Sequence, residues 1–162
     1  GRLSLVDQAG FDQYVTCRFG YDPLSVSREE FARMLQGRRG RLKPLLMHQQ
    51  VIAGIGNIYA NEILFRAGLH PNRDVGQLRE AARFKLYDAM QAVLQAAIAC
   101  GGSSVRDFFA PDGTEGRYRH HHLVYGKEGQ PCPNHCGRTI RRLQGERSSF
   151  FCPACQSLRS SQ

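Results

Sequence analysis

Apolar residues recur at helical spacing through the middle of the chain, from residue 23 to about residue 102. The longest such pattern runs over residues 77–99, where apolar positions fall three or four apart, as on one face of a helix. These positions are Leu78, Ala82, Leu86, Met90, Val93 and Ala97. Gly101 and Gly102 follow directly and end the pattern. The middle of the chain is therefore predicted to be helical.

Three shorter helices are predicted before it. Ser27 with Glu30 three positions later is typical of a capping box, and it begins a helix that Gly37 ends. A second apolar group predicts a short helix with Pro44 in its first turn: Leu42, Leu45 and Leu46. Asn57 is expected to cap a third helix over residues 58–67, which Gly68 stops.

The two ends of the chain have a different character. Residues 1–22 mix polar and apolar positions and suggest a short strand or a packed linker. After Gly102, the run Pro111-Asp112-Gly113 predicts a turn within an exposed loop. Residues 123–125 and 148–151 are expected to be two short strands. They flank a segment that is too small to hold a core of its own without a metal.

Four cysteines lie between and beside these strands, as C-x3-C, fifteen residues, then C-x2-C. Two close-set pairs suit four thiolates around a structural Zn²⁺, whereas a disulfide framework belongs to small secreted chains. The predicted ligands are Cys132, Cys136, Cys152 and Cys155. His135 is a rival to Cys136 as one ligand. The tract His120–His122 is expected to be solvated, since adjacent side chains point in different directions.

Charge points to a polyanionic partner. The chain of 162 residues has a formal net charge of +8, and Arg makes up 19 of its 22 basic residues. Six units of that excess lie in residues 117–162, and Arg binds phosphate through a planar fork. Nucleic acid is favoured over a membrane surface, with a merely soluble basic protein as the plain alternative. No run of about 18 apolar residues exists, which excludes an integral membrane helix.

Gly54 and Gly56 stand just before Asn57, where a helix is expected to begin. Small residues before a helix amino terminus leave backbone N–H groups open to a phosphate oxygen. The spacing alone is weak evidence, because such glycines more often only form a turn. A dinucleotide-binding fold is excluded, since the preceding strand and the third glycine are absent.

Four stretches, in order, resemble the formamidopyrimidine-DNA glycosylase and endonuclease VIII family, and the first of these enzymes more closely. They are Leu42–Gln49 with Ala53–Glu62 (helix-two-turn-helix), Gly101–Phe108 with Asp112-Gly113 (lesion-facing loop), Val124–Cys132 (entry to the zinc finger) and Arg147–Gln156 (its closing motif). The resemblance covers roughly residues 38–156. His48 departs from it, because the family commonly has Asp or Asn there.

The resemblance implies a mainly α helix-two-turn-helix domain followed by a small β-hairpin zinc finger. Residues 1–22 are expected to be a remnant strand and linker, 23–118 the helical domain with its lesion-facing loop near 103–118, and 119–162 the finger. The family's amino-terminal β-sandwich catalytic domain is expected to be absent. One structural Zn²⁺ would be the only cofactor.

The resemblance also assigns DNA contacts. Asn57 and Arg147 correspond to the residues that grip phosphates around a flipped-out nucleotide, and Lys43 to a basic position near the DNA backbone. Further expected contacts are Gly54, Gly56, Tyr59 and Arg106. Without the resemblance, Asn57 would be interpreted as a helix cap and Arg147 as a solvated charge.

The implied parent is a bacterial, cytoplasmic base-excision-repair glycosylase with AP lyase activity, expected to be a monomer. Its partner would be double-stranded DNA carrying oxidised purines or abasic sites. The family's nucleophile and acid are an amino-terminal Pro-Glu, whereas this chain starts Gly1-Arg2. The chain alone is thus expected to bind DNA without catalysis. The alternative is a stand-alone zinc-ribbon DNA-binding module with a regulatory or architectural role.

Overall fold

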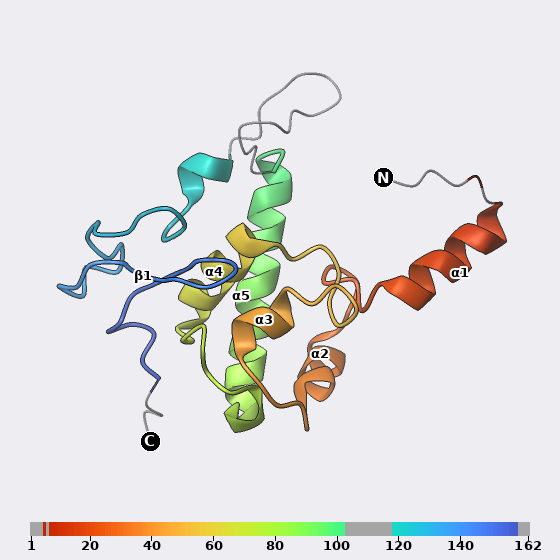
Figure 1. The fold of residues 1–162 in the computed structure, drawn as a ribbon, viewed down its shortest axis with the longest axis horizontal. Helices are drawn as coiled ribbons and strands as arrows, with labels where there is room; N and C mark the ends of the chain where they lie inside the picture. Colours follow the sequence, from red (N-terminus) through yellow and green to blue (C-terminus); the bar gives the residue numbers. More distant parts are fainter. Residues whose placement is uncertain (1–4, 6, 103–117, 159–162) are drawn as a thin grey trace.

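The computed structural model describes residues 5, 7–102 and 118–158, and it is mainly helical with one small β-hairpin (Figure 1). The helices are α1 (Gln8–Arg18), α2 (Arg28–Leu35), α3 (Leu42–Leu46), α4 (Asn57–Ala67), α5 (Glu80–Ala99) and two 3-10 turns, η1 (Val75–Gln77) and η2 (Tyr118–His121). The strands β1 (Arg141–Leu143) and β2 (Ser149–Phe151) pair antiparallel, with Arg142 opposite Phe150. Within the described residues, no helix has both the length and the apolar character to cross a bilayer.

The predicted helices of the middle region are confirmed, with two differences at their ends. The capping box is present in α2, where Ser27 Oγ accepts from the Glu30 N–H and the Glu30 carboxylate accepts from the Ser27 N–H. Gly68 ends α4 in the left-handed conformation, at φ +69°. The cap of α4 is Gly56, so the prediction that Asn57 caps this helix is wrong. Helix α5 starts at residue 80, because η1 takes up the residues just before it.

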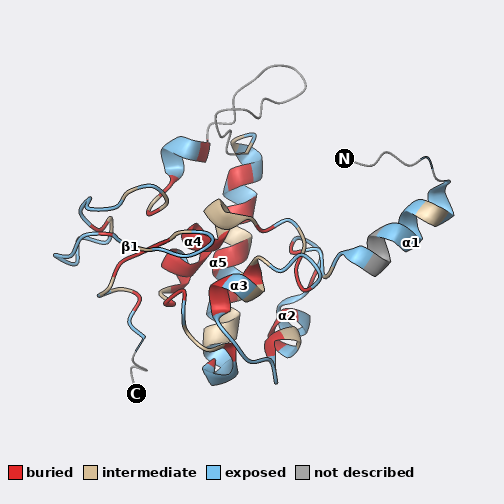
Figure 2. Cartoon of the chain, viewed as in Figure 1, coloured by how far each residue is buried: buried red, intermediate tan, exposed pale blue. Residues whose placement is uncertain are grey.

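The expectation of a strand or linker is wrong over residues 8–18, because α1 forms there, whereas residues 1–4 and 6 lie outside the described residues. Its first turn is held by Asp7, whose Oδ1 accepts from the Gly10 N–H at 2.8 Å. The aromatic side chains of Phe11 and Tyr14 are about half exposed, and α1 projects away from the other helices (Figures 1 and 2). An amphipathic pattern could not reveal a helix whose aromatic residues stay at the surface.

The expected strand at residues 123–125 is also wrong. The backbone N–H groups of Leu123, Val124 and Tyr125 all donate to the carboxylate of Glu62 on α4, at 2.7 to 3.0 Å. These N–H groups are therefore not available for the backbone hydrogen bonds of a β-sheet. The partner of β2 is therefore β1, within the span between the two cysteine pairs.

Two buried apolar clusters divide the molecule unequally. The larger lies among α2, α3, α4 and α5, and its fully buried members include Phe31, Leu35, Leu42, Leu46, Ile52, Ile55, Ile63, Leu64, Leu86 and Met90. The smaller lies under the hairpin and consists of Phe65, Val124, Cys132, Ile140, Phe150 and Cys152. Phe65 belongs to α4, so the finger completes its core on the helical part. The proposed domain boundaries at residues 22 and 118 remain predictions.

Candidate nucleic-acid interface and metal centre

The four predicted cysteines form one cluster. The sulfur atoms of Cys132, Cys136, Cys152 and Cys155 all lie within 4.8 Å of one another, with the closest pair at 3.4 Å. Tetrahedral Zn²⁺ with Zn–S bonds of about 2.3 Å requires sulfur atoms about 3.8 Å apart, so the cluster fits a structural zinc. His135 is exposed, has φ +53° and does not belong to the cluster, whose fourth member is Cys136.

Burial and a nearby backbone N–H group shift the pKa values of the thiols in opposite directions. Burial raises the pKa of the Cys132 thiol to about 12, and it also raises the pKa of Cys155. The backbone N–H of Arg138 is the main cause that lowers the pKa of the exposed Cys136 to about 7. A divalent cation deprotonates the thiols that coordinate it and so offsets the burial that opposes their charge. The donor set therefore suits a metal better than four free thiols.

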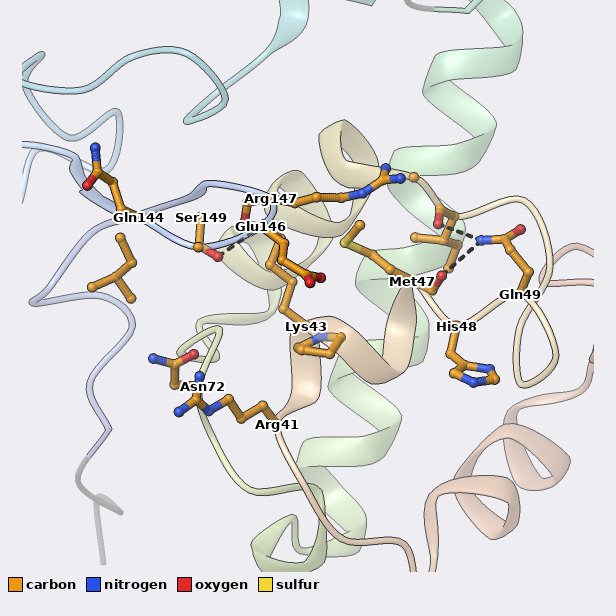
Figure 3. A pocket seen from close by; sticks show the side chains of 15 residues that line it. Arg41, Lys43, Met47, His48, Gln49, Asn72, Gln144, Glu146, Arg147 and Ser149 are labelled. Atoms are coloured by element: carbon orange, nitrogen blue, oxygen red, sulfur yellow. Dashed lines mark hydrogen bonds between the residues drawn. The ribbon is translucent and has the colours of Figure 1, made fainter.

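The glycine turn before α4 is held from two sides. Gln49 accepts from the Gly54 N–H at 2.8 Å through Oε1, and its Nε2 donates to the Met47 and Ile55 carbonyls (Figure 3). Gly54 has φ +77°, a conformation that favours glycine. Gly20 approaches the segment before this turn so closely that a Cβ there would lie 2.3 Å from the Val51 carbonyl.

The glycine turn leaves the backbone N–H groups at the amino terminus of α4 without a side-chain cap. Gly56, the N-cap, provides no side-chain hydrogen bond to the first turn, and Asn57 is the first helical residue, half-buried at the opening. Tyr59 is half-buried in the same turn of the helix, with its ring centroid 5.8 Å from that of Tyr118. A helix terminus of this kind can accept a phosphate oxygen.

Asn61 joins this terminus to the finger. Its amide Nδ2 donates to the Asn57 carbonyl at 2.7 Å and approaches the Asn57 side-chain oxygen at 3.4 Å. Its Oδ1 accepts from the Phe150 N–H, in strand β2, at 2.7 Å. Because Asn61 is fully buried, the position of β2 is fixed relative to the first turn of α4.

Lys43 is buried beneath the hairpin. Its Nζ donates to the Ser148 carbonyl at 2.6 Å, to Ser149 Oγ at 3.0 Å and to the Arg147 carbonyl at 3.4 Å. Burial, with a smaller contribution from the Arg147 charge, lowers the pKa of Lys43 to about 8. All three ammonium donors thus have partners in the finger, and Lys43 holds the turn that presents Arg147.

Glu62 is the anchor that the sequence patterns missed. Its carboxylate, 1% exposed, accepts the three backbone N–H groups of residues 123–125 described above. Gln156 acts similarly from the finger, donating to the Leu69 carbonyl and accepting from the Cys152 N–H, both at 2.9 Å. A buried glutamate on a helix resembles a solvated surface charge in sequence. No pattern along the chain distinguishes the two.

Arg147 lies in the hairpin turn, exposed, and its side chain extends toward the glycine turn across a cavity of about 790 Å³ (Figure 3). Lys43, His48, Gly56 and Arg147 line this cavity together with Arg41 and Asn72, two residues that the sequence analysis did not select. Arg106, another predicted contact, falls outside the described residues, as does most of the loop near 103–118.

The histidine tract is only partly solvated. His120 and His121 are exposed as expected, whereas His122 is buried between the rings of Tyr118 and Tyr125, so that part of the prediction is wrong. Burial is the main cause that lowers the pKa of His122 to about 4. Packing between two aromatic rings explains why this one histidine leaves the surface.

Residues 19–109 match the family profile described as the formamidopyrimidine-DNA glycosylase H2TH domain. The chain is 44% identical over 162 residues to the formamidopyrimidine-DNA glycosylase of Gluconobacter oxydans, covering 96% of this chain and 58% of that protein. The corresponding protein of Solibacter usitatus is 46% identical over 140 residues, with 86% and 53% covered.

Two solved structures are also similar. The MutM (Fpg) protein of Thermus thermophilus aligns with a TM-score of 0.84 and 41% identity, over 93% of this chain and 59% of that one. The Lactococcus lactis Fpg bound to abasic-site DNA aligns with a TM-score of 0.81 and 33% identity, over 91% and 55%. The chain therefore spans little more than half the length of these relatives.

Proposed function

The chain belongs to the formamidopyrimidine-DNA glycosylase family, whose H2TH profile matches more than half of it, and we propose that it is the DNA-binding carboxy-terminal part of a repair glycosylase. The parent enzyme would remove oxidised purines, such as 8-oxoguanine and formamidopyrimidines, and would cleave abasic sites through an AP lyase step. The Lactococcus lactis relative in complex with DNA containing an abasic site supports this assignment.

One observation carries the proposal. Asn57 and Arg147 are 90 positions apart in the sequence, yet Asn61 and Lys43 tie their two segments together. Gly56, directly before Asn57, lines the same cavity as Arg147. A damaged nucleotide can leave the stack only if the strand is held on both sides of it, and phosphate contacts hold a strand without reading its sequence. We infer that Asn57 and Arg147 are the two sides of this phosphate clamp.

The binding test uses duplex DNA with a central abasic-site analogue and fluorescence anisotropy. We expect Asn57→Ala and Arg147→Ala each to weaken binding by about 1–2 kcal/mol, because each removes a phosphate contact. Arg33→Ala, an exposed residue on α2, is the matched control and should bind like the parent chain. Parent-like affinity of both clamp variants at low salt would refute the assignment.

The catalytic test follows from the family's chemistry. The resemblance places the family's Pro-Glu nucleophile and acid in its catalytic domain, whereas residues 19–109 of this chain match the H2TH domain. We therefore expect no excision of 8-oxoguanine and no nicking of abasic DNA by the chain alone. Borohydride trapping on both duplexes, beside an intact family enzyme, measures this. Trapping on the 8-oxoguanine duplex at a comparable rate would reveal another nucleophile and refute the proposal.

A further inference from the structure

A second hollow, of about 330 Å³, lies on the finger and shares no lining residue with the clamp cavity. It is lined by Arg138, Arg141, Pro153 and Ala154. Among the residues that the structure describes, the one ion pair joins Arg28 to Asp88, so no described carboxylate neutralises either arginine. Two guanidinium groups at one small hollow provide the planar donor forks that bind phosphate oxygens.

The backbone at both arginines is firmly held. The Arg138 carbonyl accepts from the Cys132 N–H at 2.8 Å, and the Arg138 N–H donates to the sulfur of Cys136. Arg141 sits in the ladder of β1, opposite Phe151. The two guanidinium groups therefore project from a zinc knuckle and a paired strand, which are more rigid supports than a loop.

The register of β1 relates this hollow to the clamp. Side chains alternate along a strand, so Arg141 and Leu143 lie on the same face of the hairpin. Leu143 lines the clamp cavity together with Arg147. Two residues along a strand span about 7 Å, and each DNA strand carries a phosphate per roughly 3.4 Å of helix axis. The two hollows are thus close enough for one duplex to reach both.

We propose that Arg138 and Arg141 form a second phosphate site for the backbone of the same duplex, outside the clamp formed by Asn57 and Arg147. This inference rests on the proposed function, because it requires that the chain binds DNA. The competing explanation is that the arginines balance the charge of −2 that four thiolates leave around Zn²⁺. The experiment below separates the two.

The test measures the affinity for a labelled abasic-site duplex, extended by a full helical turn on each side, over a series of salt concentrations. Arg138→Ala/Arg141→Ala should lower the slope of log affinity against log salt by about 0.9, the value for one phosphate. Affinity at the lowest salt should fall by about tenfold. Arg138→Lys/Arg141→Lys keeps the charge without the fork and should restore most of the slope but only part of the affinity.

The matched control is Arg18→Ala/Arg33→Ala, which removes the same charge from exposed positions on α1 and α2, two helices on the opposite side of the molecule from β1 (Figure 1). It should retain the parent slope. If the finger double variant also retains that slope, the site does not exist. Faster zinc loss to a chelator with an unchanged slope would assign the arginines to the metal centre instead. Failure of the parent chain to bind the duplex would refute the proposed function itself.

Discussion

The helical part and the finger are stable for different reasons. The helical part buries a large apolar cluster among four helices, with side chains such as Phe31, Leu64 and Met90 withdrawn from solvent. The finger has six residues in its buried cluster, of which two are cysteines of the four-thiol cluster and one, Phe65, belongs to α4. Each buried apolar side chain contributes about 1.5–3 kcal/mol, so the finger cannot depend on its own core.

Polar groups replace the missing core at the boundary between them. Lys43, Asn61 and Glu62 are all buried, and each bonds to the finger, mainly to its backbone. Buried polar groups that are fully paired fix one arrangement, whereas apolar contacts tolerate sliding. The helical part therefore determines where the finger lies, and the metal is expected to keep the finger folded.

Metal removal should have the largest effect, unfolding the finger while the helical part stays folded. Structural zinc contributes about 10–16 kcal/mol of apparent binding free energy in zinc-finger peptides, far more than the finger's apolar contacts. Chelation should abolish hydrogen-exchange protection at Ile140 and Phe150 and leave Leu64 protected. Cys152→Ser should behave like the chelated chain, and Cys100→Ser, outside the cluster, like the parent.

Two results would contradict this prediction. One is the absence of zinc in protein purified without chelator, measured by elemental analysis. The other is loss of zinc from His135→Ala together with its retention in Cys136→Ala, which would exchange the fourth ligand.

Removing the Glu62 carboxylate should have the next largest effect. Glu62→Ala leaves three backbone N–H groups without their acceptor, at about 1–3 kcal/mol for each group that stays unpaired. We expect a loss of at least about 3 kcal/mol in the free energy of unfolding by urea. Glu62→Gln keeps one acceptor oxygen, so its free energy of unfolding should lie between those of the parent chain and Glu62→Ala. Glu128→Ala, at an exposed position, should change little, and a similarly small loss in Glu62→Ala would contradict the anchoring role.

The pH dependence of Lys43 should be the smallest effect. Its pKa is about 8 in the folded chain, against a usual value of 10.5. The charged ammonium holds the turn that presents Arg147, so affinity for DNA should decline as pH rises through about 8, by less than about tenfold. Stability should move in the opposite sense. Between pH 8 and 10.5 the unfolded chain binds more protons, so this group makes unfolding less favourable as pH rises.

Anisotropy at a series of pH values tests this prediction with Lys43→Met as the comparison. The variant should bind more weakly than the parent at neutral pH and lose the decline around pH 8. An identical decline in both proteins would show that another group titrates.

Much of the helical part could be predicted because its signals are local. Ser27 with Glu30 begins α2, and Gly68 ends α4, each through bonds within a few residues. The metal ligands were equally accessible, because thiol spacing predicts a zinc site directly.

The features that the sequence did not predict have physical causes. Helix α1 has exposed aromatic residues, so its pattern did not indicate a helix. Residues 123–125 resemble a strand in sequence because their partner is a side chain, Glu62, far away along the chain. Lys43 and Asn61 carry no local sign of burial, since their partners are more than 80 residues distant. Tertiary hydrogen bonds of this kind appear only in the folded chain.

We propose that the finger presents Arg147 to DNA while α4 presents Asn57. The most direct test compares the duplex affinity of the parent, Arg147→Ala and Asn57→Ala with and without metal. With zinc, both substitutions should weaken binding by about tenfold, equivalent to about 1.4 kcal/mol. After chelation, Arg147→Ala should cost nothing further, whereas Asn57→Ala should still weaken binding. An Arg147→Ala effect that persists unchanged without metal, or is absent with it, would contradict the account.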